Sequence, residues 1–84
     1  MALYPDLKDR VILLTGGANG IGAATVREFH RQGARIFFSD VDEEAGASLA
    51  AELGEGAVFR KVDLRREAQV RSWIRQVGKR ESRV

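Results

Sequence analysis

Cysteine is absent from this 84-residue chain, and histidine occurs once, as His30. Neither a disulfide framework nor a thiolate metal site can form without cysteine, and one histidine does not build a zinc site. Apolar runs never exceed four residues, as in Val11–Leu14, and no basic stretch followed by an apolar one opens the chain. Because a membrane helix needs about 20 apolar residues, we expect no membrane segment, no secretion and a cytoplasmic location.

Aromatic residues make up only 7% of the chain. This low content helps to interpret the uneven distribution of charge along the sequence. Residues 1–59 carry five basic and nine acidic side chains, for −4, whereas residues 60–84 carry nine basic and three acidic, for +6. A basic segment can bind nucleic acid or anionic lipid. Because this segment has a single aromatic residue, Trp73, and no series of aromatic residues interleaved to stack on bases, we favour a solvated helix face and expect no nucleic-acid partner.

The hydrophobic pattern alternates between continuous apolar runs and helical spacing. The runs predict buried strands over Arg10–Thr15, Ala34–Ser39 and Ala57–Val62. Helices are expected over Ile21–Gln32, from an N-cap at Asp42 to Leu53, and from about Glu67 to Lys79. Their apolar faces are predicted from Ala24 or Thr25, Val26 and Phe29 in the first helix, Ala45, Leu49 and Leu53 in the second, and Val70, Ile74 and Val77, with Trp73 nearby, in the third.

This order predicts an α/β fold, a partial Rossmann unit (βαβαβα) whose three-stranded parallel sheet has the order 3-2-1. Right-handed crossovers place the first two helices on one face of the sheet. Only the third helix remains for the other face, which is too little cover for three apolar strands. Strand 10–15 is then an open edge, so residues 1–84 are expected to form an incomplete domain.

The segment Thr15–Gly22 reads Thr-Gly-Gly-Ala-Asn-Gly-Ile-Gly between the first strand and the first helix. Gly16 allows a sharp reversal of the chain, Gly20 allows the backbone to approach a pyrophosphate, and Gly22 permits close packing of the helix on the sheet. The N–H of Ile21 and the positive end of the helix dipole favour an anion. We therefore expect a phosphate-binding turn rather than a merely flexible connection.

Asp40 ends the second strand, 18 residues after Gly22, where a dinucleotide site places an acid that accepts from ribose hydroxyls. Its charge would repel a 2′-phosphate, by up to roughly 4 kcal/mol at 4 Å and an effective dielectric near 20. No Arg or Lys in the turn or directly after Asp40 offsets this repulsion. NAD is therefore expected rather than NADP. The alternative is a helix cap, a position that Asp42 fills better.

Asp63 and Leu64 follow the third strand, at the edge of the sheet where an adenine would lie. The Asp63 carboxylate can accept from the adenine amino group, and the Leu64 N–H can donate to a ring nitrogen. The alternative for this pair is a simple turn that ends the strand.

These motifs resemble the N-terminal part of a short-chain dehydrogenase/reductase, in the branch with the TGxxxGIG turn, over about residues 7–80. The resemblance implies that Asn19 and Ile21 contact the cofactor pyrophosphate, Asp40 the ribose, and Asp63 with Leu64 the adenine. It also implies an oxidoreductase that transfers a hydride between NAD and a carbonyl or alcohol.

The active-site motifs of that family do not occur in this chain. Family members continue into a fourth strand, an Asn-Asn-Ala-Gly turn, a catalytic Ser and a Tyr-x-x-x-Lys pair. Tyr4 and Lys8 have the spacing of that Tyr-x-x-x-Lys pair. We interpret this match as chance, because the two residues precede the first strand. We expect a truncated dinucleotide-binding half-domain over residues 1–84 that lacks the catalytic half and is inactive alone. The alternative is a non-catalytic nucleotide-binding module, or one that self-associates through the edge of strand 10–15.

Overall fold

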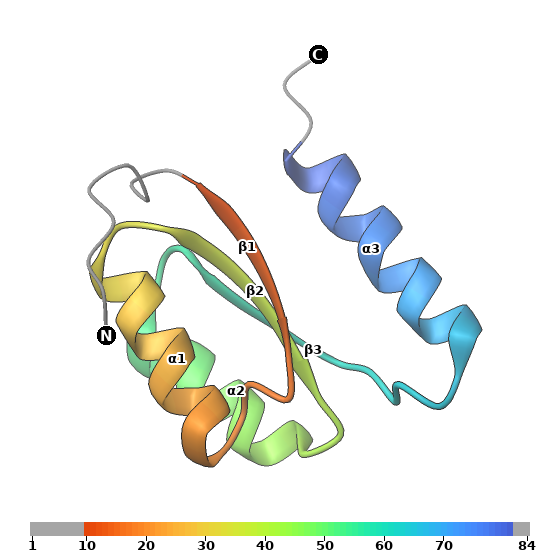
Figure 1. The fold of residues 1–84 in the computed structure, drawn as a ribbon, viewed down its shortest axis with the longest axis horizontal. Helices are drawn as coiled ribbons and strands as arrows, with labels where there is room; N and C mark the ends of the chain where they lie inside the picture. Colours follow the sequence, from red (N-terminus) through yellow and green to blue (C-terminus); the bar gives the residue numbers. More distant parts are fainter. Residues whose placement is uncertain (1–9, 82–84) are drawn as a thin grey trace.

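A computed structural model describes residues 10–81, in which strands and helices alternate (Figure 1). The elements are β1 (Val11–Thr15), α1 (Gly20–Arg31), β2 (Arg35–Asp40), α2 (Glu43–Leu53), β3 (Ala57–Lys61) and α3 (Glu67–Glu81). The predicted elements are confirmed, with ends that differ by no more than two residues. Tyr4 and Lys8 lie outside the described residues. None of the helices in residues 10–81 is long and apolar enough to span a bilayer.

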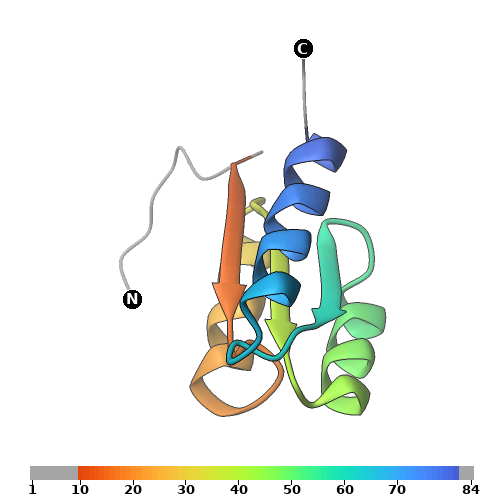
Figure 2. The same cartoon turned by 90° about the vertical axis from the view of Figure 1, so that its right-hand side faces the viewer.

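The three strands form one parallel sheet with β2 in the centre. Val11 pairs with Arg35 across β1 and β2, and Ile36 pairs with Ala57 across β2 and β3. This arrangement confirms the predicted order 3-2-1. All three strands point the same way in Figure 2, so their carboxyl ends meet at one edge of the sheet.

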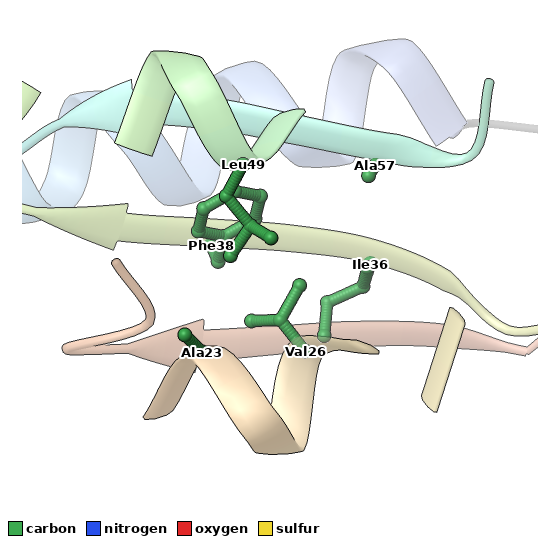
Figure 3. Close-up of a cluster of buried hydrophobic side chains, with 6 residues drawn as sticks. All are labelled: Ala23, Val26, Ile36, Phe38, Leu49 and Ala57. Atoms are coloured by element: carbon green, nitrogen blue, oxygen red, sulfur yellow. The ribbon is translucent and has the colours of Figure 1, made fainter. Parts of the chain in front are cut away.

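Helices α1 and α2 cover one face of the sheet, as predicted (Figure 1). Their core is formed by Ala23, Val26, Ile36, Phe38, Leu49 and Ala57 (Figure 3). Ala23, rather than Ala24 or Thr25, is the buried residue one turn before Val26. The prediction for this position was wrong because the neighbouring alanines fit the helical spacing almost equally well. The Thr25 hydroxyl instead donates to the Ile21 carbonyl at 2.8 Å.

Helix α3 lies alone on the opposite face (Figures 1 and 2). Its core comprises Phe37, Val62, Trp73 and Val77, with Val58 and Val70 packed against it. Ile74 is 53% exposed, so its predicted place on the apolar face was wrong and Trp73 takes that role. On β1, Val11 and Leu13 are 37% and 43% exposed. The prediction that one helix cannot cover all three strands is therefore confirmed.

Candidate functional site

The glycine turn between β1 and α1 is bonded to the end of β2. The N–H groups of Gly16 and Gly17 donate to the Ser39 carbonyl at 2.8 and 3.1 Å. Gly16 has φ 71° and Gly20 has φ 58°, in the left-handed region that residues with a side chain adopt at a cost. The turn thus reverses at two glycines and is held against the central strand.

Gly22 marks a close approach between α1 and the turn itself. A Cβ added at Gly22 would lie 1.9 Å from the carbonyl oxygen of Gly16. The glycine packed against the sheet is instead Gly17, where a Cβ would lie 2.9 Å from Cβ of Phe38. At Gly20 an added Cβ would meet nothing within 4 Å. Gly22 therefore shapes the turn, and the backbone at Gly20 faces open space.

The first turn of α1 presents unpaired backbone donors. The first N–H groups of a helix have no carbonyl partner within the helix, and the amides of Gly20, Ile21 and Gly22 have no other hydrogen-bond partner among residues 10–81. No acidic residue occupies this turn, and Ile21 is 88% exposed. Adjacent Asn19 directs its side-chain amide to Asp42 at 2.9 Å. The helix end thus offers three N–H groups and a positive dipole to an anion.

Asp40 joins the glycine turn to the start of α2. Its Oδ2 accepts from the Ala18 N–H at 3.2 Å, and its Oδ1 accepts from the Asp42 N–H at 3.1 Å. Each carboxylate oxygen has two acceptor sites, so one remains on each, enough for two hydroxyl donors. Helix α2 is capped by Asp42, which accepts from the Ala45 N–H at 3.0 Å. This bond, together with the Asn19 amide, lowers the pKa of Asp42.

A surface hollow of about 210 Å³ lies at the carboxyl ends of the strands. It is lined by Gly16, Ser39, Asp40, Val41, Val62, Asp63 and Leu64. Four of the residues singled out in the sequence therefore meet here, while Asn19, Gly20, Ile21 and Gly22 lie beyond Gly16 at the start of α1. The apolar side chains of Val41 and Leu64 are 58% and 54% exposed. The hollow thus combines two carboxylates with apolar side chains open to solvent.

Sequence reasoning missed two groups in this hollow. Val41 follows Asp40, and an apolar residue directly after a strand-ending acid could have indicated it. Ser39 is 1% exposed, and its hydroxyl has no hydrogen-bond partner among the described residues. No sequence signal distinguishes such a serine from an ordinary strand residue.

The Asp63 carboxylate is held by the side chain and backbone of Arg65, which sequence reasoning also missed. The guanidinium Nε donates to Oδ1 at 3.1 Å and Nη2 donates to Oδ2 at 3.0 Å, while the Arg65 N–H donates to Oδ1 at 3.0 Å. The Asp63 N–H donates to Oε1 of Gln69 at 3.0 Å. The side-chain bond from Arg65, followed by its backbone bond, lowers the pKa of Asp63 to about 2. Asp63 is therefore an ionised, fixed acceptor at neutral pH.

Comparison with known proteins identifies relatives that are similar in sequence over most of this chain. The chain is 47% identical over 73 residues to a probable galactose dehydrogenase of Rhizobium meliloti, covering 82% of this chain and 28% of that protein. It is also 47% identical over 62 residues to a 3-beta-hydroxysteroid dehydrogenase of Comamonas testosteroni, covering 74% and 24%. The chain thus spans between 24% and 28% of the length of these two curated relatives.

Solved structures show the same fold. A 3-ketoacyl-(acyl-carrier-protein) reductase of Brucella melitensis, complexed with NADH, matches with a TM-score of 0.84 and 27% identity over 88% of this chain and 31% of that one. A short-chain dehydrogenase/reductase of Burkholderia phymatum, in complex with NAD, matches with a TM-score of 0.83 and 25% identity over 88% and 27%. The sequence pattern of the short chain dehydrogenase family matches residues 10–84. This chain therefore belongs to the short-chain dehydrogenase/reductase family.

Proposed function

We propose that this chain binds NAD and is the nucleotide-binding portion of a short-chain dehydrogenase/reductase. The observation that carries the proposal is the meeting of three features at one sheet edge: the free amides of α1, the two open acceptor sites of Asp40, and the hollow beside Asp63. In this arrangement the amides bind the pyrophosphate, Asp40 accepts from the ribose hydroxyls, and the hollow takes the adenine. The NADH and NAD complexes of the two structural relatives support this assignment.

The same arrangement favours NAD over NADP. Asp40 is followed by three further acids, Asp42, Glu43 and Glu44, and Glu43 and Glu44 occupy the first turn of α2. A 2′-phosphate on the adenosine ribose would add negative charge beside the Asp40 carboxylate. The Asn19 amide, a polar side chain of the turn, is neutral and already donates to Asp42.

Calorimetric titration with NAD, NADP and adenosine tests this proposal. The Asp40→Ala variant should bind NAD about tenfold or more weakly, because hydrogen bonds to a charged acceptor contribute about 1.5–3 kcal/mol, and its preference for NAD over NADP should shrink. Glu55→Ala is the matched control: it removes the same charge from an exposed position just before β3, at the opposite end of the strands from Asp40. Equal indifference of the unmodified chain to all three ligands would overturn the proposal.

We further propose that the chemistry of the longer relatives is transfer of a hydride between NAD and a carbonyl or alcohol. NAD, when bound, supplies or accepts that hydride. The residues of this chain bind and orient the cofactor, and the 84-residue chain alone does not turn over. Dehydrogenase activity that copurifies with the chain and disappears on Gly20→Val substitution would contradict this.

Self-association is a second candidate function, favoured by the exposed side chains of Val11 and Leu13. Within residues 10–81, β1 pairs only with β2, so its other edge can accept a strand. Two copies joined at this edge would form a six-stranded sheet and cover these side chains. Sedimentation that shows a stable, folded monomer would overturn this second candidate.

A further inference from the structure

The loop after β3 contains a guanidinium–carboxylate pair, and its arginine, Arg65, takes no part in the proposed cofactor contacts. The side chain of Arg65 is 88% exposed, yet the residue donates three N–H groups to the Asp63 carboxylate. The backbone of the same aspartate is also bonded on both sides, to Gln69 and to the Arg66 N–H at 2.9 Å. Asp63 therefore has one fixed orientation at the rim of the hollow.

The acceptor sites of Asp63 are nearly filled by this pair. A carboxylate offers about four lone-pair sites, two on each oxygen. Oδ1 accepts from the Arg65 backbone N–H and from Nε, whereas Oδ2 accepts only from Nη2. One acceptor site is left, on Oδ2. The neighbouring Leu64 N–H has no hydrogen-bond partner among residues 10–81, so one acceptor and one donor stand side by side.

We propose that Arg65 is a positioning residue that aims the single remaining acceptor site of Asp63 at the exocyclic group of the bound base. This inference rests on the proposed binding of NAD and deepens it, because it names the residue that sets selectivity for the base. An adenine amino group donates to that site. A hypoxanthine presents a carbonyl oxygen there, which meets a second acceptor and leaves both without a donor. Without Arg65, Asp63 can rotate, and the distinction between the two bases weakens.

The test compares NAD with nicotinamide hypoxanthine dinucleotide, in which an oxo group replaces the adenine amino group and the adjacent ring nitrogen carries a proton. Affinities for both are measured by calorimetry with the unmodified chain, Arg65→Ala and Arg66→Ala. The unmodified chain should favour NAD by about tenfold or more, and Arg65→Ala should reduce that ratio about 3- to 10-fold. Arg66→Ala, which removes the same charge one residue further on, should leave the ratio unchanged. Arg65→Lys restores the charge but not the paired N–H groups and should recover the ratio only in part.

Each of the other possible results contradicts either the proposed binding of NAD or the proposed role of Arg65. If the unmodified chain binds neither dinucleotide, the proposed function fails. If it binds NAD but Arg65→Ala weakens both dinucleotides equally, the role of Arg65 is structural and the inference fails while NAD binding stands. An equal fall of the ratio in Arg66→Ala would assign the effect to charge alone. Tighter binding of NAD by Arg65→Ala would show that the arginine competes with the base, which also contradicts the inference.

Discussion

Apart from Ile74 on α3, the exposed large apolar side chains of the described residues lie in two parts of the surface, and the surroundings of these two parts differ. Ile21, Val41 and Leu64 lie around the glycine turn and the hollow, while Val11 and Leu13 lie on β1. The first group stands among free amides and carboxylate oxygens with open acceptor sites. The second group lies on a strand whose backbone polar groups are turned along the sheet, toward its partner strand and its open edge.

The difference indicates what each surface can bind. A mixture of apolar side chains and a few placed polar groups is typical of small-molecule sites, and it matches a ligand that has both a flat base and charged phosphates. The β1 surface offers apolar area and a strand edge, which suit packing against protein. Apolar side chains of similar exposure therefore indicate different partners when the polar groups around them differ.

The largest expected effect comes from breaking the close contact within the glycine turn. Gly22→Ala would place a methyl group 1.9 Å from the Gly16 carbonyl oxygen, where only backbone can yield. We expect a loss of about 3 kcal/mol in the free energy of unfolding, measured by urea denaturation. Gly78→Ala is the control, because an added Cβ there meets nothing within 4 Å and α3 should gain up to about 1 kcal/mol. A Gly22→Ala variant as stable as the unmodified chain would contradict the described geometry of the turn.

A smaller effect distinguishes the apolar side chains around the hollow from those on β1. Leu64→Ser removes an apolar wall of the hollow and should weaken NAD binding about fivefold, as expected from the loss of apolar area of roughly 1 kcal/mol. Leu13→Ser makes the same chemical change on β1 and should alter NAD affinity less than about twofold. Fluorescence titration of both variants measures the contrast. If Leu13→Ser weakens binding as much as Leu64→Ser does, the distinction between the two surfaces fails.

The smallest expected effect is on the stability of the fold at acidic pH. Bonding to Arg65 lowers the pKa of Asp63 from 3.8 to about 2 in the folded chain. Because the folded pKa is depressed, this carboxylate stabilises the fold above pH 3.8, and the contribution is lost as the pH falls toward 2. A carboxyl-carbon NMR titration should show a midpoint of about 2 for Asp63, moving up toward the ordinary value in Arg65→Ala. A midpoint near 3.8 in the unmodified chain would exclude the pairing with Arg65.

Local patterns in the sequence predicted the elements and their order, because strand runs and helical spacing are read over a few residues. The sequence predicted less well which face of each helix is buried: Ala24 or Thr25 was predicted in place of Ala23, and Ile74 was placed on the face where Trp73 is buried. In both cases an adjacent apolar residue satisfied the same spacing. Only tertiary packing decides between such neighbours.

The candidate site was also only partly predictable. The glycines and Asp40 follow from a motif whose spacing is set by backbone geometry. The pairing of Arg65 with Asp63 depends on side-chain torsions, and the orphaned hydroxyl of Ser39 depends on what packs around it. Such contacts are set by the assembled loop rather than by local sequence. They become visible only when the strand ends are brought together.

The most direct test of the central claim is an NMR titration of the isotope-labelled chain with NAD, followed through its backbone amides. The account predicts shifts at Gly20–Gly22, at Asp40 and Val41, and at Asp63 and Leu64, with the amides of Val11 and Leu13 unchanged. Shifts confined to β1, or no shifts at NAD concentrations well above those of a cell, would contradict it.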